Sequence, residues 1–132
     1  MNLPLTWEEV FLRLNESKES RHAMMAEILA ASIAHQIRET RIKRGLTQRQ
    51  LAGRTGTKQS VIARYERGDY INYQIDTLQK IAAALDCALI IRFDNWSIFI
   101  SSLGVEFIAP ESFDAEELIA LADNRAKTGI QP

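Results

Sequence analysis

The spacing of hydrophobic residues changes near the last third of the chain. Up to Leu85, apolar side chains recur at intervals of three and four residues, which is typical of helices packed on a core. Beyond it come two short runs rich in β-branched and aromatic residues, 89–93 and 96–100. The pattern predicts a mainly α-helical protein that ends in a tail of a different type.

Two helices are expected before residue 45. Thr6 and Glu9 have the spacing of a capping box, so a first helix is predicted to begin there and to end near residues 15–17. The second helix is predicted to begin between residues 17 and 20 and to end at Arg44, with Gly45 as its C-terminal cap.

The segment from Leu46 to Gly68 has the pattern of two short helices joined by a tight turn. Thr47 and Gln50 form a second capping box, and Gly56 can adopt the positive φ of a sharp turn. Thr57 can then cap a helix over residues 58–67. The side chains predicted to lock the two helices together are Leu51, Ala52 and Ile62. This combination predicts a helix-turn-helix whose second helix faces outward.

The C-terminal third is predicted to hold a β-hairpin. A helix over residues 77–85, capped by Asp76, is followed by strands at 89–93 and 96–100 around an Asp94-Asn95 turn. Both faces of such a hairpin are apolar, so it must be covered by helices of the same chain or paired with a second copy. A last helix is expected from Asp114 through Leu121.

The quoted motif resembles the Cro/phage-repressor type of helix-turn-helix, known as the Xre family. The resemblance extends over roughly residues 33–85 and is densest in TQRQLAGRTGTKQSVIARYERG. It implies a lambda-repressor-like five-helix bundle that binds operator DNA as a dimer. We therefore expect an N-terminal helical extension at 1–30, the DNA-binding domain at 31–87, and a hairpin and helical tail at 88–132 that is a possible dimerisation region.

Charge is concentrated in the same segment. Residues 35–68 hold nine basic and two acidic residues, a formal charge of +7, whereas the rest of the chain holds seven basic and fifteen acidic residues, or −8. A basic block within an acidic chain is typical of a localised site for a polyanion, although one strongly charged, solvated helix face would give the same count. Because the block coincides with the helix-turn-helix, double-stranded DNA is the expected partner.

The second helix of the motif is expected to enter the major groove, where each base pair presents a distinct pattern of donors and acceptors. If Ile62 points inward, Gln59 and Arg64 point outward, and they can bond adenine and guanine respectively. Lys58 and Ser60, in the first turn, can reach either base edges or phosphates.

Other contacts follow from the resemblance. It implies that Gln48 grips a phosphate at a helix N-terminus, and that Arg41 and Glu66 form an internal salt bridge that orients the recognition helix. Further phosphate contacts are expected from basic side chains around the motif, each of which is also compatible with simple solvation: Arg49, Lys43, Arg44 and Arg67.

Other classes of function find little support. The two histidines, His22 and His35, have no ligand partners at metal spacing, and no nucleophile turn or glycine-rich phosphate loop is present, so no enzyme, metal or cofactor is expected. No apolar run is long enough to span a membrane, no secretory signal is visible, and the single Cys87 fits a reducing cytoplasm.

Two functions remain. The first is a sequence-specific transcriptional regulator, expected to be a repressor, that acts as a homodimer on a palindromic operator because one helix reads only a few base pairs. The alternative is an antitoxin that binds a toxin protein through residues 1–30 and 88–132 while it represses its own operon. The two functions are compatible.

Overall fold

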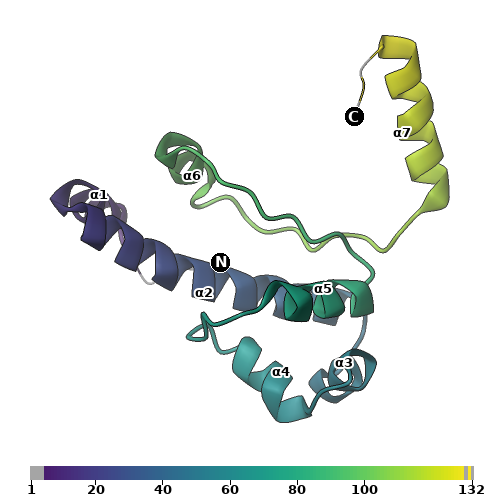
Figure 1. Ribbon diagram of the computed structural model, residues 1–132, viewed down its shortest axis with the longest axis horizontal. Coiled ribbons are helices and arrows are strands. Elements are labelled where there is room, and N and C mark those ends of the chain that lie inside the picture. The colour runs from purple at the N-terminus through teal and green to yellow at the C-terminus, as the bar shows by residue number, and fades with distance from the viewer. Residues whose placement is uncertain (1–4, 130, 132) are drawn as a thin grey trace.

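The computed structural model describes residues 5–129 and 131, which form seven helices and no β-strand. Their order is α1 (Trp7–Glu16), α2 (Lys18–Lys43), α3 (Gln48–Thr55), α4 (Gln59–Tyr65), α5 (Ile75–Ala84), α6 (Trp96–Ser102) and α7 (Ala115–Thr128). Figure 1 shows α2 as a long central rod, with α3, α4 and α5 gathered at one of its ends and α1 and α6 at the other. No helix in this part of the chain is long and apolar enough to cross a membrane.

Helix α2 connects two separate hydrophobic cores. Its C-terminal half contributes Ile37 to the core of the helix-turn-helix, which also includes Leu51, Ile62, Ile81 and Leu85. Its N-terminal half contributes to a smaller core made of Val10, Met24 and Ile28, against which α6 packs. Because α2 runs unbroken through residue 30, the expected N-terminal extension and the DNA-binding domain share one helix.

Local signals determine where several helices begin. Thr6 and Thr47 each accept a hydrogen bond from the backbone N–H three residues later, and Glu9 and Gln50 complete the two capping boxes. Helix α5 begins at Ile75 without a side-chain cap, so the predicted Asp76 cap is wrong. Helix α4 begins one residue after the predicted start, with Lys58 rather than Thr57 at the N-cap.

The predicted β-hairpin is wrong. Residues 89–93 are extended but form no ladder, and Trp96–Ser102 is helix α6. The physical reason is tertiary burial: as a helix, this segment packs Phe99, Ile100 and Leu103 against the core of α1 and α2, which outweighs the β-propensity of its residues. Asn95, expected in the hairpin turn, is instead the N-cap of α6.

The expected five-helix bundle is also wrong. The core of the helix-turn-helix is built by four helices, α2 to α5, because the next helix, α6, packs at the other end of α2. An extended segment leads from α5 to α6, and a second one returns beside it toward α7 (Figure 1). The last helix is longer than predicted and reaches Thr128.

Candidate nucleic-acid interface

The turn between α3 and α4 has the geometry that the sequence predicts for a helix-turn-helix. Gly56 adopts a left-handed conformation with φ of 68°, and the N–H of Thr57 donates to the carbonyl of Ala52 at 2.9 Å. Leu51 and Ile62 are fully buried where the two helices meet. Since Ile62 points inward, the opposite face of α4 is available to solvent.

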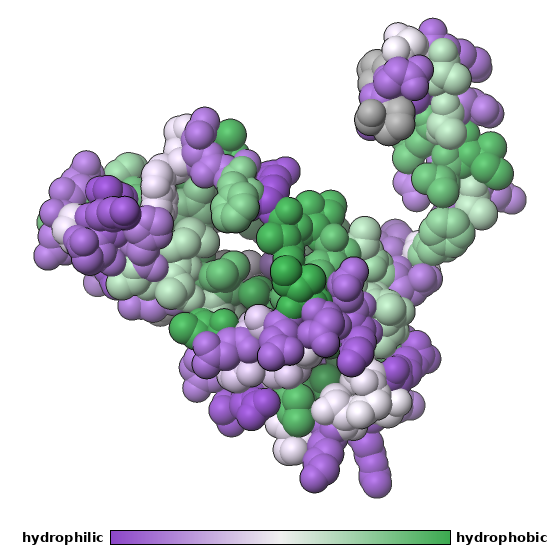
Figure 2. All heavy atoms as spheres, in the orientation of Figure 1, coloured by the Kyte–Doolittle hydropathy of each residue, from purple (hydrophilic) through white to green (hydrophobic). Residues whose placement is uncertain are grey.

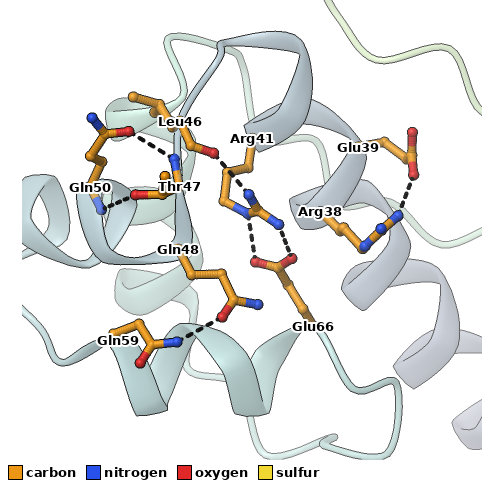
Figure 3. A network of polar contacts seen from close by, with 9 residues as sticks. All are labelled: Arg38, Glu39, Arg41, Leu46, Thr47, Gln48, Gln50, Gln59 and Glu66. Carbon is orange, nitrogen blue, oxygen red and sulfur yellow. Dashed lines mark hydrogen bonds and ion pairs between the residues drawn. The ribbon is translucent and has the colours of Figure 1, made fainter.

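An ion pair fixes the end of α4. The Arg41 guanidinium donates to both carboxylate oxygens of Glu66, at 2.9 and 2.8 Å, and also to the carbonyl of Leu46 at 2.8 Å (Figure 3). The two charged side chains are only 12% and 3% exposed. The contact joins the end of α2, the loop before α3 and the residue after α4, so Arg41 holds the end of α4 against α2 from inside the protein.

The outward face of α4 begins with three exposed residues, Lys58, Gln59 and Ser60. The Gln59 side-chain amide donates to the Gln48 side-chain carbonyl at 2.9 Å (Figure 3). This bond connects the first turn of α4 to the first turn of α3. It also pre-orients two amides that sequence analysis assigns to different parts of the DNA, the base edge and the phosphate.

An open hollow of about 600 Å³ lies beside this pair of amides. Its lining consists of Arg41, Thr47, Gln48, Arg49 and Gln59. The hollow is at the N-terminus of α3, where unpaired backbone N–H groups and the helix dipole favour an anion. A backbone phosphate is the group that these features suit.

Arg64 is held differently from the other predicted base-contacting residues. It is only partly exposed, and its guanidinium carbon lies 4.8 Å from the centre of the Tyr70 ring and 5.6 Å from that of Tyr65. The Arg64 Nε is buried and has no hydrogen-bond partner among the described residues. A cation over an aromatic face is attracted to the ring quadrupole, so the two tyrosines limit the conformations of the arginine.

Tyr70 belongs to a cluster that also includes Tyr65 and Tyr73, with ring centres 4.9–5.2 Å apart. The Tyr73 hydroxyl donates to the carbonyl of Tyr65 at 3.0 Å, and burial raises the pKa of Tyr73 to about 12. Sequence analysis missed Tyr70, although the recurrence of tyrosine at 65, 70 and 73 beside the recognition helix was a signal.

Lys43 and Arg44 both bond to the C-terminal segment. Lys43 donates to the carbonyl of Ala109 at 2.8 Å and pairs with Glu111 at 2.6 Å. Arg44 donates to the carbonyls of Leu85 and Pro110, each at 2.7 Å. The hydrogen bond and charge of Lys43 lower the pKa of Glu111. Phosphate contact by either cation stays a prediction, and such contact would compete with these bonds.

The nine cations of the basic block therefore differ in their partners. Four have carboxylate partners in the described chain: Arg38, Arg41, Lys43 and Arg67, the last paired with Asp69 at 3.5 Å. Arg44 bonds only to backbone carbonyls. The other four have no ion-pair partner among the described residues, and these are Arg49, Arg54, Lys58 and Arg64. All four lie on α3, on α4 or on the turn between them. The helix-turn-helix thus carries cations that are free to meet a polyanion.

The described residues offer little chemistry of another kind. They contain no cluster of three or more His, Cys, Asp or Glu side chains that could hold a metal ion. Cys87 packs against the core of the helix-turn-helix, and burial raises the pKa of its thiol. A raised pKa disfavours the thiolate that a nucleophile requires.

These features define the class of the protein: a helix-turn-helix DNA-binding protein. Residues 37–90 match the family described as Helix-turn-helix, and the motif identifies the domain as one of the Xre type. The chain thus carries the DNA-binding domain of a transcription regulator. No curated protein matches the chain in sequence.

The Arg41–Glu66 pair yields a prediction about stability. Replacing Glu66 with Ala leaves the mostly buried Arg41 without its counter-charge, which should reduce the free energy of unfolding by about 3–5 kcal/mol. Glu39→Ala, which removes the partner of the exposed Arg38, is the matched control and should cost less than about 1 kcal/mol. Urea unfolding of both variants measures the difference, and equal costs would contradict the orienting role of Arg41.

Proposed function

We propose that this protein is a sequence-specific repressor that binds a palindromic operator as a homodimer. The observation that carries the proposal is the outward face of α4, where Lys58, Gln59 and Ser60 are exposed beside the unpaired cations of α3 and α4. One such helix reads only a few base pairs, so useful specificity needs two half-sites roughly 34 Å apart. A protein bound across a promoter excludes the polymerase sterically, which makes repression the simplest outcome.

Each group at the site has a separate role in this proposal. Gln59 bonds an adenine edge and Arg64 a guanine edge, while Lys58 and Ser60 contact bases or phosphates at the start of α4. Gln48 and Arg49 hold a phosphate in the hollow at the N-terminus of α3. Arg67 adds a further backbone contact. The regulator would act in the cytoplasm, where it meets the DNA.

The first test is footprinting of the purified full-length protein on the DNA upstream of its own gene. Binding should weaken steeply as salt rises, because bound cations displace the counterions condensed on the phosphates. Protection of two half-sites separated by one helical turn would support the dimer. Absence of salt-dependent binding to the upstream region would contradict the proposed function.

Arg64 and Arg49 should have different effects on DNA binding. Arg64→Ala should remove about 1–3 kcal/mol of discrimination at one base pair in each half-site, because it removes a base contact. Arg49→Ala should weaken binding to all sequences alike and reduce the salt slope by about 1 per half-site, because it removes a phosphate contact. Competition binding with single-base operator variants, repeated at several salt concentrations, separates the two effects.

Tyr70 should influence selectivity through Arg64. Tyr70→Leu removes the ring face that holds the guanidinium, so discrimination at the Arg64 base pair should fall about threefold to fivefold, the value of an exposed cation–π contact. Tyr70→Phe keeps the ring and should retain selectivity. If both variants lose it equally, the ring face is not what positions Arg64.

A second candidate function is that of an antitoxin, and the exposed face of α1 favours it. Trp7 and Phe11 are each 51% exposed and stack with ring centres 6.1 Å apart, and Leu12 is also exposed. An apolar patch rimmed by charge is typical of a surface that binds another protein.

If a neighbouring gene encodes a toxin, its product co-expressed with this chain should co-purify with it. Phe11→Asp combined with Leu12→Asp should abolish that complex and leave operator binding unchanged, because α1 lies at the other end of α2 from the helix-turn-helix (Figure 1). Complex formation that survives the double substitution would exclude α1 as the contact surface.

A further inference from the structure

Apart from α6, which packs on the core of α1 and α2, the last third of the described chain contributes little to either core. We define the C-terminal arm as residues 86–129. All fully buried hydrophobic residues lie between Val10 and Leu85, and no residue of the arm is fully buried. Instead, the arm exposes large apolar side chains, with Phe93 entirely in solvent and Ile108 81% exposed. Figure 2 shows hydrophobic atoms at the surface along the extended segments and on α7.

The extended part of the arm before α6 also has no backbone partner within the described chain. Within the described chain, residues 88–94 form no backbone hydrogen bond, either with one another or with the returning segment. Helix α7 is separated from α5 by an open hollow of about 420 Å³, which lies beside the first turns of α7. Exposed apolar side chains and unpaired backbone groups together make an edge that other chains can join.

Helix α7 carries opposite charge at its two ends. Its first turn contains Glu116 and Glu117, and its last turn contains Arg125 and Lys127. If two copies of this helix pack antiparallel, each acidic turn lies beside the basic turn of the other copy. The two helix dipoles then also oppose one another favourably. A partner surface that is uniformly acidic or uniformly basic would complement only one end of α7. The charge pattern therefore favours a second copy of the same chain.

We propose that the C-terminal arm is the self-association surface, and that α7 packs antiparallel against α7 of a second copy about a two-fold axis near Leu121. This deepens the homodimer of the proposed function by naming its interface. In this arrangement Glu117 of each chain pairs with Arg125 of the other. The apolar side chains covered between the copies include Phe113, Leu118 and Leu121.

The exposed apolar surface is large enough for a stable dimer. The extended segments add four exposed side chains to those of α7: Ile90, Ile91, Phe93 and Ile108. Complete burial of one such side chain removes roughly 100 Å² from water, so covering all seven of these groups would bury on the order of 700 Å² per chain. Stable interfaces bury about 800 Å² per partner, so the arm provides most of what a dimer needs.

The arm is also tied to the DNA-binding domain. Lys43 and Arg44 donate to the carbonyls of Ala109 and Pro110. Within the arm, the carboxylate of its first residue, Asp86, accepts from the N–H of Phe113 at 3.0 Å. These bonds lie just before α7 along the chain. A two-fold axis through the arms therefore fixes the distance between the two recognition helices, which operator half-site spacing requires.

A charge exchange in the full-length chain tests the pairing. Glu117→Arg and Arg125→Glu each create two repulsive contacts in the symmetric dimer, so each variant should dimerise about tenfold more weakly than the wild type. An equimolar mixture of the two variants places arginine opposite glutamate at both contacts. The mixture should therefore form heterodimers with affinity near that of the wild type. Sedimentation velocity over a range of concentrations measures all four samples.

Two further variants complete the test. Leu118→Glu places a charge in the apolar seam and should weaken dimerisation at least as much as either exchange. Because Leu118 is 55% exposed and outside both cores, the variant should keep its helical circular dichroism and melting temperature. Glu8→Arg, an exposed charge reversal on α1, is the matched control and should leave the dimer unchanged.

Several results would overturn the inference. These are a monomeric wild type, variants that dimerise normally, or a mixture no stronger than its components. The proposed function fails separately: it is contradicted by loss of salt-dependent operator binding. If an α7 variant that no longer dimerises still discriminates between single half-sites through Arg64, DNA reading does not depend on the proposed interface.

Discussion

The ion pair between Arg41 and Glu66 is the contact on which the reading surface depends. It lies almost out of solvent and joins the end of α2 to the residue after α4, while Arg41 also bonds the carbonyl of nearby Leu46. Burying two charges is costly, and a well-packed apolar pair would often be as stable. The ion pair also fixes the orientation of the end of α4 relative to α2, because a bidentate guanidinium–carboxylate contact constrains both distance and angle. The proposed recognition of base edges by α4 would need that geometric control.

The basic residues of one segment serve two different purposes, which their sequence alone does not separate. Arg41, Lys43 and Arg44 make bonds within the protein, whereas Arg49, Arg54, Lys58 and Arg64 have no ion-pair partner in the described chain. Internal bonds hold the helix-turn-helix and the arm in place. The unpaired cations lie around α3 and α4, which is why the proposed DNA surface is narrower than the basic block itself.

The sequence predicted features that depend on neighbouring residues and failed where distant contacts decide. The capping boxes at Thr6 and Thr47 and the turn at Gly56 are local, and the structure has all three. Trp96–Ser102 has the composition of a strand, yet the core of α1 and α2 selects a helix there. Lys43 is another such case, because its partners Ala109 and Glu111 are more than sixty residues away.

The site was predictable to a similar extent. Outward placement of Gln59 follows from the helical period once Ile62 is known to point inward, and Gln59 is exposed. The same argument places Arg64 outward. It cannot show that the guanidinium lies over the Tyr70 ring, because it is the course of the loop after α4 that places Tyr70 there. Periodicity gives the face of a helix, while the conformation of a long side chain depends on what packs beside it.

The surfaces proposed for DNA reading and for self-association thus lie on different parts of the chain. Its two cores involve α1 to α6, whereas α7 has no buried residue and is joined to the rest by bonds from Lys43, Arg44 and Asp86 to the segment before it. A surface that contributes nothing to the core can change its partner without affecting the fold. The bonds at its base would still transmit the position of that partner to α2, and through Arg41 to α4. If the two proposals hold, association and DNA reading would be coupled through the end of a single helix, residues 41–44.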